Sequence, residues 1–64
     1  MLRSKRKARR LSQKEAARML NIKNTYLSLI ETKKRTNLKI ELIDKICKFY
    51  DIELQSFLEW LKEK

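Results

Sequence analysis

Small polar side chains gather in the segment NTYLSLIE, which spans residues 24–31. On a helix, Asn24, Thr25 and Ser28 would share one face, with Leu29 at its edge. Asparagine can pair bidentately with adenine, serine and threonine can bond to several bases, and leucine can touch a thymine methyl group. These side chains could therefore recognise bases. An ordinary amphipathic helix with its polar face in solvent would show the same pattern, so the segment alone leaves both interpretations open.

Basic side chains are concentrated in the same half of the chain. Residues 1–35 hold twelve lysines and arginines against two acids, Glu15 and Glu31, which gives a charge of +10. Residues 36–64 hold five basic and six acidic residues, which gives −1, and the whole chain carries +9. A nucleic acid is the common partner of such a basic half. A solvated, lysine-rich surface that favours solubility is the alternative.

The chain contains neither glycine nor proline. Strand turns usually need one of them, whereas the apolar residues here recur at steps of three and four, which predicts an all-α fold. A chain of this length forms one small domain, expected over residues 1–64. Helices are predicted at about residues 2–9, 12–20, 24–31, 39–50 and 54–62.

Two features would position the polar segment. Ser12 and Glu15 fit an S-x-x-E capping box, which would fix the start of the second helix. Tyr26, Leu27 and Ile30 would anchor the other face of the third helix in the core. Further apolar stripes are predicted in the last two helices: Ile40, Ile43, Ile46, Cys47 and Tyr50, then Leu54, Phe57, Leu58 and Leu61.

The composition argues against several classes of protein. There is no histidine and a single cysteine, Cys47, so the chain cannot form an internal disulfide or a zinc site, and no cofactor or metal is expected. The carboxylates are scattered rather than paired, so an enzyme is not expected. No segment reaches the ~20 apolar residues of a membrane span, and no signal peptide is evident. We therefore expect a soluble, cytoplasmic protein with no membrane partner.

The segment from Leu11 to Arg35 resembles the Cro/phage-repressor helix-turn-helix family, also called the xenobiotic-response-element type. The resemblance rests on L-S-Q-x-E-x-A at residues 11–17, on Leu20, Ile22, Tyr26-Leu27-Ser28, Ile30-Glu31 and Lys34-Arg35, and more weakly on residues 43–47 and 52–58. It implies a compact five-helix, lambda-repressor-like domain whose third helix lies in the DNA major groove.

The resemblance also implies roles for individual residues. Asn24 and Thr25 would read bases at the start of the recognition helix, and Ser28 and Leu29 one turn later. Arg6 would form a structural ion pair with Glu31. Gln13, which would also brace the recognition helix, and the loop residues Lys34 and Arg35 would bind phosphates. Arg10, Lys23 and Lys33 are further cations that we expect to bind phosphates.

The sequence departs from the family pattern where helices end. Glycine is usual at the positions of Arg10, Asn21, Lys33 and Asp51, so these residues are expected to take positive φ angles. Asparagine and aspartate tolerate that conformation better than arginine and lysine. Lys23 stands where a serine or threonine cap is common, so Asn24 is the residue expected to cap the third helix.

The basic N-terminus has three interpretations. Its cations are Arg3, Lys5, Arg6, Lys7, Arg9 and Arg10. They could line the phosphate backbone, extend as an arm into a groove, or remain solvated, and we favour the first.

Trp60 lies off the apolar stripe of the last helix and suggests a partner surface. The stripe itself is more typical of a core, yet a homodimer formed through this helix, with Trp60, Phe57 and Leu61 at its interface, is the preferred assembly. A dimer would place two recognition helices roughly 34–36 Å apart and would predict a palindromic operator.

The leading functional hypothesis is a DNA-binding transcriptional regulator, a repressor of phage, plasmid or mobile-element type. The alternative is an antitoxin-like interaction module of the same fold, with a toxin or another regulator as its protein partner. A membrane-active cationic peptide is disfavoured because the basic and apolar residues occupy different segments rather than opposite faces of one helix.

Overall fold

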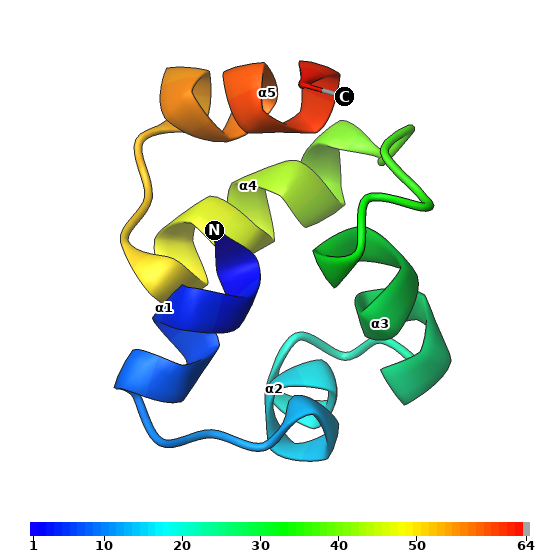
Figure 1. The fold of residues 1–64 in the computed structure, drawn as a ribbon, viewed down its shortest axis with the longest axis vertical. Helices are drawn as coiled ribbons and strands as arrows, with labels where there is room; N and C mark the ends of the chain where they lie inside the picture. Colours follow the sequence, from blue (N-terminus) through cyan, green and yellow to red (C-terminus); the bar gives the residue numbers. More distant parts are fainter. Residues whose placement is uncertain (64) are drawn as a thin grey trace.

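Five helices follow one another in the computed structural model, which describes residues 1–63 (Figure 1). They are α1 (Leu2–Ala8), α2 (Gln13–Met19), α3 (Asn24–Glu31), α4 (Ile40–Tyr50) and α5 (Leu54–Lys62). No strand occurs within these residues. The all-α, five-helix prediction is confirmed, and each helix begins and ends within two residues of its expected boundary.

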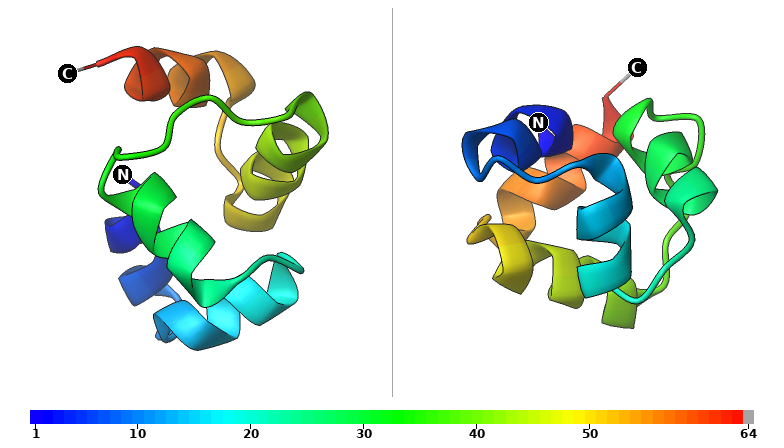
Figure 2. Two further views of the ribbon diagram at one scale, coloured as in Figure 1. Left: turned by 90° about the vertical axis from the view of Figure 1, so that its right-hand side faces the viewer. Right: turned by 90° about the horizontal axis from the view of Figure 1, so that it is seen from below.

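The helices pack in pairs around one core. α2 lies against α3, α4 against α5, and α1 against α4. Figure 1 shows α5 and α4 on one side of the molecule and α2 on the other, with α3 along the edge, and Figure 2 shows the same arrangement from two further sides. All five helices contribute to the core, whose buried residues are Leu2, Ala16, Ala17, Leu20, Leu27, Ile30, Ile43, Ile46, Cys47, Tyr50, Phe57 and Leu61.

Leu2 explains how a helix as polar as α1 is held in place. Its side chain has no exposed surface and belongs to the core cluster. Residues 2–8 are therefore helical and docked from the first turn, so the interpretation of the N-terminus as an extended arm is wrong.

Two predicted core positions are exposed. Ile40 is 60% accessible to solvent and Leu54 is 46% accessible, although both follow the apolar stripe of their helix. Each is the first residue of its helix. The apolar period of a sequence predicts on which face of the helix a side chain lies. It does not predict whether a neighbouring helix extends far enough to cover the first residue of that face.

The four positions where glycine was expected are the residues with positive φ among those described. Arg10 has a φ of 56°, Asn21 of 59°, Lys33 of 61° and Asp51 of 54°. A left-handed conformation costs a non-glycine residue roughly 1–2 kcal/mol because its Cβ approaches a carbonyl oxygen. The chain tolerates this strain at four separate helix ends.

We expect Arg10→Gly to stabilise the domain by about 0.5–1 kcal/mol, since relief of the strain outweighs the added flexibility of the unfolded chain. Thermal unfolding followed by circular dichroism measures the change. Lys14→Gly is the matched control, because it removes the same charge inside a helix and should cost about 1 kcal/mol. Equal destabilisation by both variants would contradict the account.

Candidate nucleic-acid interface

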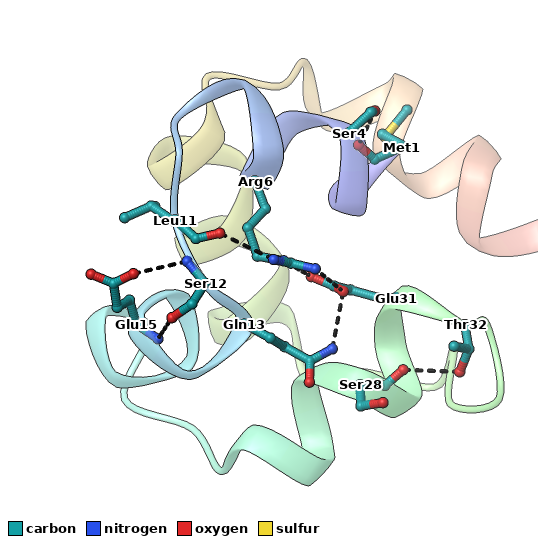
Figure 3. Close-up of polar contacts among 10 residues, drawn as sticks. All are labelled: Met1, Ser4, Arg6, Leu11, Ser12, Gln13, Glu15, Ser28, Glu31 and Thr32. Atoms are coloured by element: carbon teal, nitrogen blue, oxygen red, sulfur yellow. Dashed lines mark hydrogen bonds and ion pairs between the residues drawn. The ribbon is translucent and has the colours of Figure 1, made fainter.

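The start of α2 is fixed by a complete capping box (Figure 3). The Ser12 Oγ accepts a hydrogen bond of 3.0 Å from the backbone N–H of Glu15, and Glu15 Oε1 accepts one of 2.9 Å from the Ser12 N–H. Hydrogen bonds from the backbone and side chain of Ser12 lower the pKa of Glu15. The predicted capping box is confirmed, and it sets the orientation of the residue that follows it, Gln13.

The end of α2 is held by a contact that the sequence did not reveal. The chain turns at Asn21, and the Ile22 N–H bonds to the Ala17 carbonyl at 2.9 Å. Lys45, from α4, donates a hydrogen bond of 3.2 Å to the carbonyl of Leu20. A cation at the C-terminal end of a helix also matches the negative end of the helix dipole. The turn between α2 and α3 is thereby tied to α4.

α3 begins without a side-chain cap. Lys23 occupies the cap position and no side chain bonds to the free N–H groups, so the prediction that Asn24 caps this helix is wrong. The helix is held from beneath instead, because Leu27 and Ile30 are fully buried. The Asn24 side chain is therefore not engaged in capping.

The outer face of α3 carries the four predicted base-reading residues. Asn24 and Thr25 are exposed, Leu29 is 38% exposed, and Ser28 is half-buried. These side chains form a ridge along the helix, while the opposite side lies in the core. The ridge is presented to the outside by a helix that cannot rotate without exposing Leu27.

A polar network joins α3 to the two preceding helices (Figure 3). Arg6 Nε donates to Glu31 Oε2 at 2.8 Å, and Arg6 Nη2 donates to Oε1 at 3.3 Å. Gln13 Nε2 also donates to Oε1, at 3.1 Å. Arg6 Nη1 bonds to the Leu11 carbonyl at 3.0 Å. The side chains of Arg6 and Glu31 are only 11% and 3% exposed, and the bond to Glu31 raises the pKa of Arg6.

Two hollows flank the ridge. One, next to the network, is lined by Arg3, Arg6, Gln13, Ser28, Glu31 and Thr32. The other is lined by Tyr26, Arg35, Asn37, Leu38, Lys39 and Leu42. Tyr26 and Ser28 leave α3 in nearly opposite directions because each residue turns a helix by about 100°. Arg35 lies over the Tyr26 ring, with its guanidinium carbon 5.3 Å from the ring centroid. Cationic side chains therefore line hollows on both sides of the ridge.

The predicted phosphate-binding residues do not all lie together. Arg10, Lys23, Lys34 and Arg35 are exposed, and Gln13 is half-buried at the network. Lys33 is directed towards α5 instead, with its amine 3.2 Å from Glu63 Oε1 and 4.8 Å from the Trp60 ring centroid. Lys33 therefore has a carboxylate partner within the molecule, and its role in phosphate binding stays a prediction.

The expected dimer interface also needs correction. Phe57 is fully buried and Leu61 is 8% exposed, so both belong to the core of a single chain and offer almost no surface to a second one. Trp60 is half-buried and stacks on Phe57, with ring centroids 5.8 Å apart. An amphipathic stripe looks the same whether it packs within a chain or between chains, so the sequence could not separate the two.

Arg3, one of the N-terminal cations expected to line the phosphate backbone, lines the first hollow, and Lys39, which sequence reasoning missed, lines the second. Arg3 and Arg6 are three residues apart and so share a helix face. Lys39 gave no signal in the sequence, because its place depends on the path of the loop between α3 and α4.

No other chemical site is evident in the part of the chain that the structure describes. Among residues 1–63 no cluster of three histidine, cysteine or acidic side chains could hold a metal ion. Cys47 is a buried free thiol whose pKa is raised by burial. None of the described helices is long and apolar enough to cross a membrane.

Comparison with known families agrees with this geometry. The family model described as helix-turn-helix matches residues 2–57, which include α1 to α4 and the first half of α5. Neither the curated proteins nor the solved structures gave a significant match. The matched segment contains the capping box, the turn, the exposed ridge and the Arg6–Glu31 pair. The chain belongs to the Cro/C1-type helix-turn-helix family of DNA-binding regulators.

Proposed function

We propose that this protein regulates transcription by binding double-stranded DNA in a sequence-specific manner, with α3 in the major groove. The major groove admits one α-helix and displays a distinct pattern of donors and acceptors for each base pair. The observation that carries the proposal is the exposed ridge of Asn24, Thr25, Ser28 and Leu29 on a helix locked by its buried face. A fixed helix can present these side chains in one geometry.

The cations around the ridge would hold the DNA backbone. Arg10, Lys23, Lys34 and Arg35 are exposed and would neutralise phosphates on either side of the groove. Gln13 sits at the N-terminus of α2, where free N–H groups favour an anion. Its amide is held by Glu31, so it would brace α3 and contact phosphate from a defined position.

We further propose that the protein is a repressor of the phage, plasmid or mobile-element type, which blocks polymerase by occupying its operator. Selection of bound duplexes from a random pool tests the DNA-binding proposal. An enriched motif is expected, and a pool that remains random after several rounds would contradict sequence-specific binding. Repression is then measured with the enriched motif placed in a reporter promoter, where expression should fall.

Asn24→Ala should reduce discrimination between the selected duplex and a scrambled one by about 1–3 kcal/mol, because an amide contact to a base edge is lost. Lys34→Ala is the control, since a phosphate contact carries no sequence information and its loss should weaken both duplexes equally. Affinities measured by fluorescence anisotropy separate the two effects. Equal losses on both duplexes for Asn24→Ala would remove it from the base-reading set.

The assembly is also a proposal. Two copies that meet through α5 would bring two recognition helices to the same side of the DNA and would select a palindromic motif. Exposed Leu54 and half-buried Trp60 support this helix as the contact. A symmetric enriched motif, together with a dimeric mass in sedimentation, is the expected result.

The second candidate function is an antitoxin-like module that binds another protein. It is favoured by the exposed Ile40 and by a hollow between α5 and the loop before α4, lined by Leu38, Ile43, Leu58 and Leu61 among others. Isolation of a stable complex with a different protein from cells would support this candidate, and recovery of the chain alone or with itself would oppose it.

A further inference from the structure

The cations of α1, together with Arg9 at its C-terminal end, have different surroundings in the structure. Arg6 is paired with Glu31. The Arg9 guanidinium lies 5.8 Å from the Phe49 ring centroid and 5.7 Å from that of Tyr50, so it packs against α4. Arg3, Lys5 and Lys7 remain exposed.

Arg3 and Lys7 lie on one face of α1. They are four residues apart, so their side chains leave the helix on the same side, one turn from each other. Lys5 leaves the helix on nearly the opposite side, because two residues correspond to a rotation of about 200°. The helix therefore has a cationic face formed by Arg3 and Lys7 and a separate single cation, Lys5.

The Arg3–Lys7 face reaches the recognition surface at Arg3. Arg3 lines the same hollow as Gln13, Ser28 and Thr32, which come from α2, α3 and the end of α3. The carboxylate in this hollow, Glu31, is already neutralised by Arg6. Among residues 1–63, the ion pairs are Arg6–Glu31, Lys33–Glu63 and Lys48–Asp44, and none uses Arg3 or Lys7. The two charges are thus available to an external anion.

We propose that Arg3 and Lys7 bind the phosphate backbone of duplex DNA beside the base pairs that α3 reads, and so extend the interface onto flanking DNA. The inference rests on the proposed function, since α3 must first lie in the groove. Four residues of α1 separate Arg3 from Lys7 by about 6 Å along the helix axis, and phosphates rise about 3.4 Å per nucleotide along one strand. Arg3 and Lys7 can therefore meet two different phosphates of one strand.

Contacts of this kind have a clear thermodynamic signature. Each phosphate that a cation neutralises releases counterions, so the logarithm of the binding constant falls with the logarithm of the salt concentration by about 0.9 per contact. We call this dependence of the logarithm of the binding constant on the logarithm of the salt concentration the salt slope. Phosphate contacts carry no sequence information. Removal of the Arg3 and Lys7 charges should therefore reduce the salt slope equally on cognate and scrambled DNA.

The test compares Arg3→Gln, Lys7→Gln and the double variant with Lys5→Gln, which removes the same charge from the opposite side of α1. Binding to the selected duplex and to a scrambled duplex is measured by fluorescence anisotropy over a range of salt concentrations. We expect each single variant to reduce the salt slope by about one and the double variant by about two, on both duplexes. Lys5→Gln should leave the slope unchanged, and circular dichroism should show that all variants are folded.

Two results would overturn the inference. A double variant with the slope of the parent protein would show that the face does not touch phosphates. A loss of slope in Lys5→Gln equal to that in Lys7→Gln would show that net charge matters rather than the face. If the parent protein prefers its selected duplex but the double variant keeps its slope, the proposed function stands and this inference fails. If the parent shows no preference for any duplex, the proposed function itself fails.

Discussion

Glu31→Ala is expected to destabilise the domain by about 3–5 kcal/mol, because it leaves the largely buried guanidinium of Arg6 without its counter-charge. The same substitution removes the acceptor of the Gln13 amide, so α1, α2 and α3 lose their common polar contact. A domain of this size has only about 3–10 kcal/mol of stability in total. Urea unfolding followed by circular dichroism should show a strongly lowered midpoint and a population that is partly unfolded at room temperature.

The chain offers a matched control for this prediction. Asp44→Ala breaks the Lys48–Asp44 pair, whose side chains are 78% and 59% exposed, and should change the stability by less than about 0.5 kcal/mol. If Glu31→Ala unfolded no more easily than Asp44→Ala, the Arg6 network would not hold the helices together. A double variant, Arg6→Met with Glu31→Leu, should recover most of the loss because no unpaired charge remains.

Leu27→Ala is the second large effect, with an expected loss of about 2–5 kcal/mol from lost burial and the cavity left behind. Leu27 is fully buried and anchors the underside of α3. Leu29→Ala tests the opposite face of the same helix, since Leu29 is 38% exposed and its truncation should scarcely change the urea midpoint. Similar midpoints for the two variants would mean that α3 is not oriented as described.

Features that depend on local chemistry could be predicted from the sequence. The capping box needs only Ser12 and Glu15, which are neighbours along the chain. The left-handed residues, such as Arg10 and Asp51, were expected from the resemblance instead, because members of the family usually have glycine at these positions. The exposed ridge of α3 follows from its period, because Leu27 and Ile30 fix which side is buried.

Features that depend on tertiary contacts could not be predicted in this way. Lys33 looks like any loop cation until Glu63 and Trp60, about thirty residues later in the chain, are brought beside it. Lys45 becomes a cap for α2 only after α4 is placed. Phe57 fits a core and an interface equally well on a helical wheel, and only the packing of α5 on α4 decides between them.

The fold also gives the N-terminal cations different surroundings. The charge count of the sequence shows that the first half of the chain is basic. It does not show which of the cations have a partner within the molecule. The structure pairs Arg6 with Glu31 and places Arg9 against two aromatic rings. Of the exposed cations that remain in α1, Arg3 and Lys7 share one face, and Lys5 lies on another. We therefore propose a salt-dependent contribution to binding from Arg3 and Lys7 in this helix, in addition to that of Arg10.

The measurement that tests the central claim most directly is the affinity of the purified protein for its selected duplex and for a scrambled duplex of equal length, in salt near physiological strength. Recognition of bases by the ridge on α3 predicts that the selected duplex binds roughly a thousandfold more tightly or better. Equal affinities would contradict the account, since attraction between cations and phosphates alone does not distinguish one sequence from another.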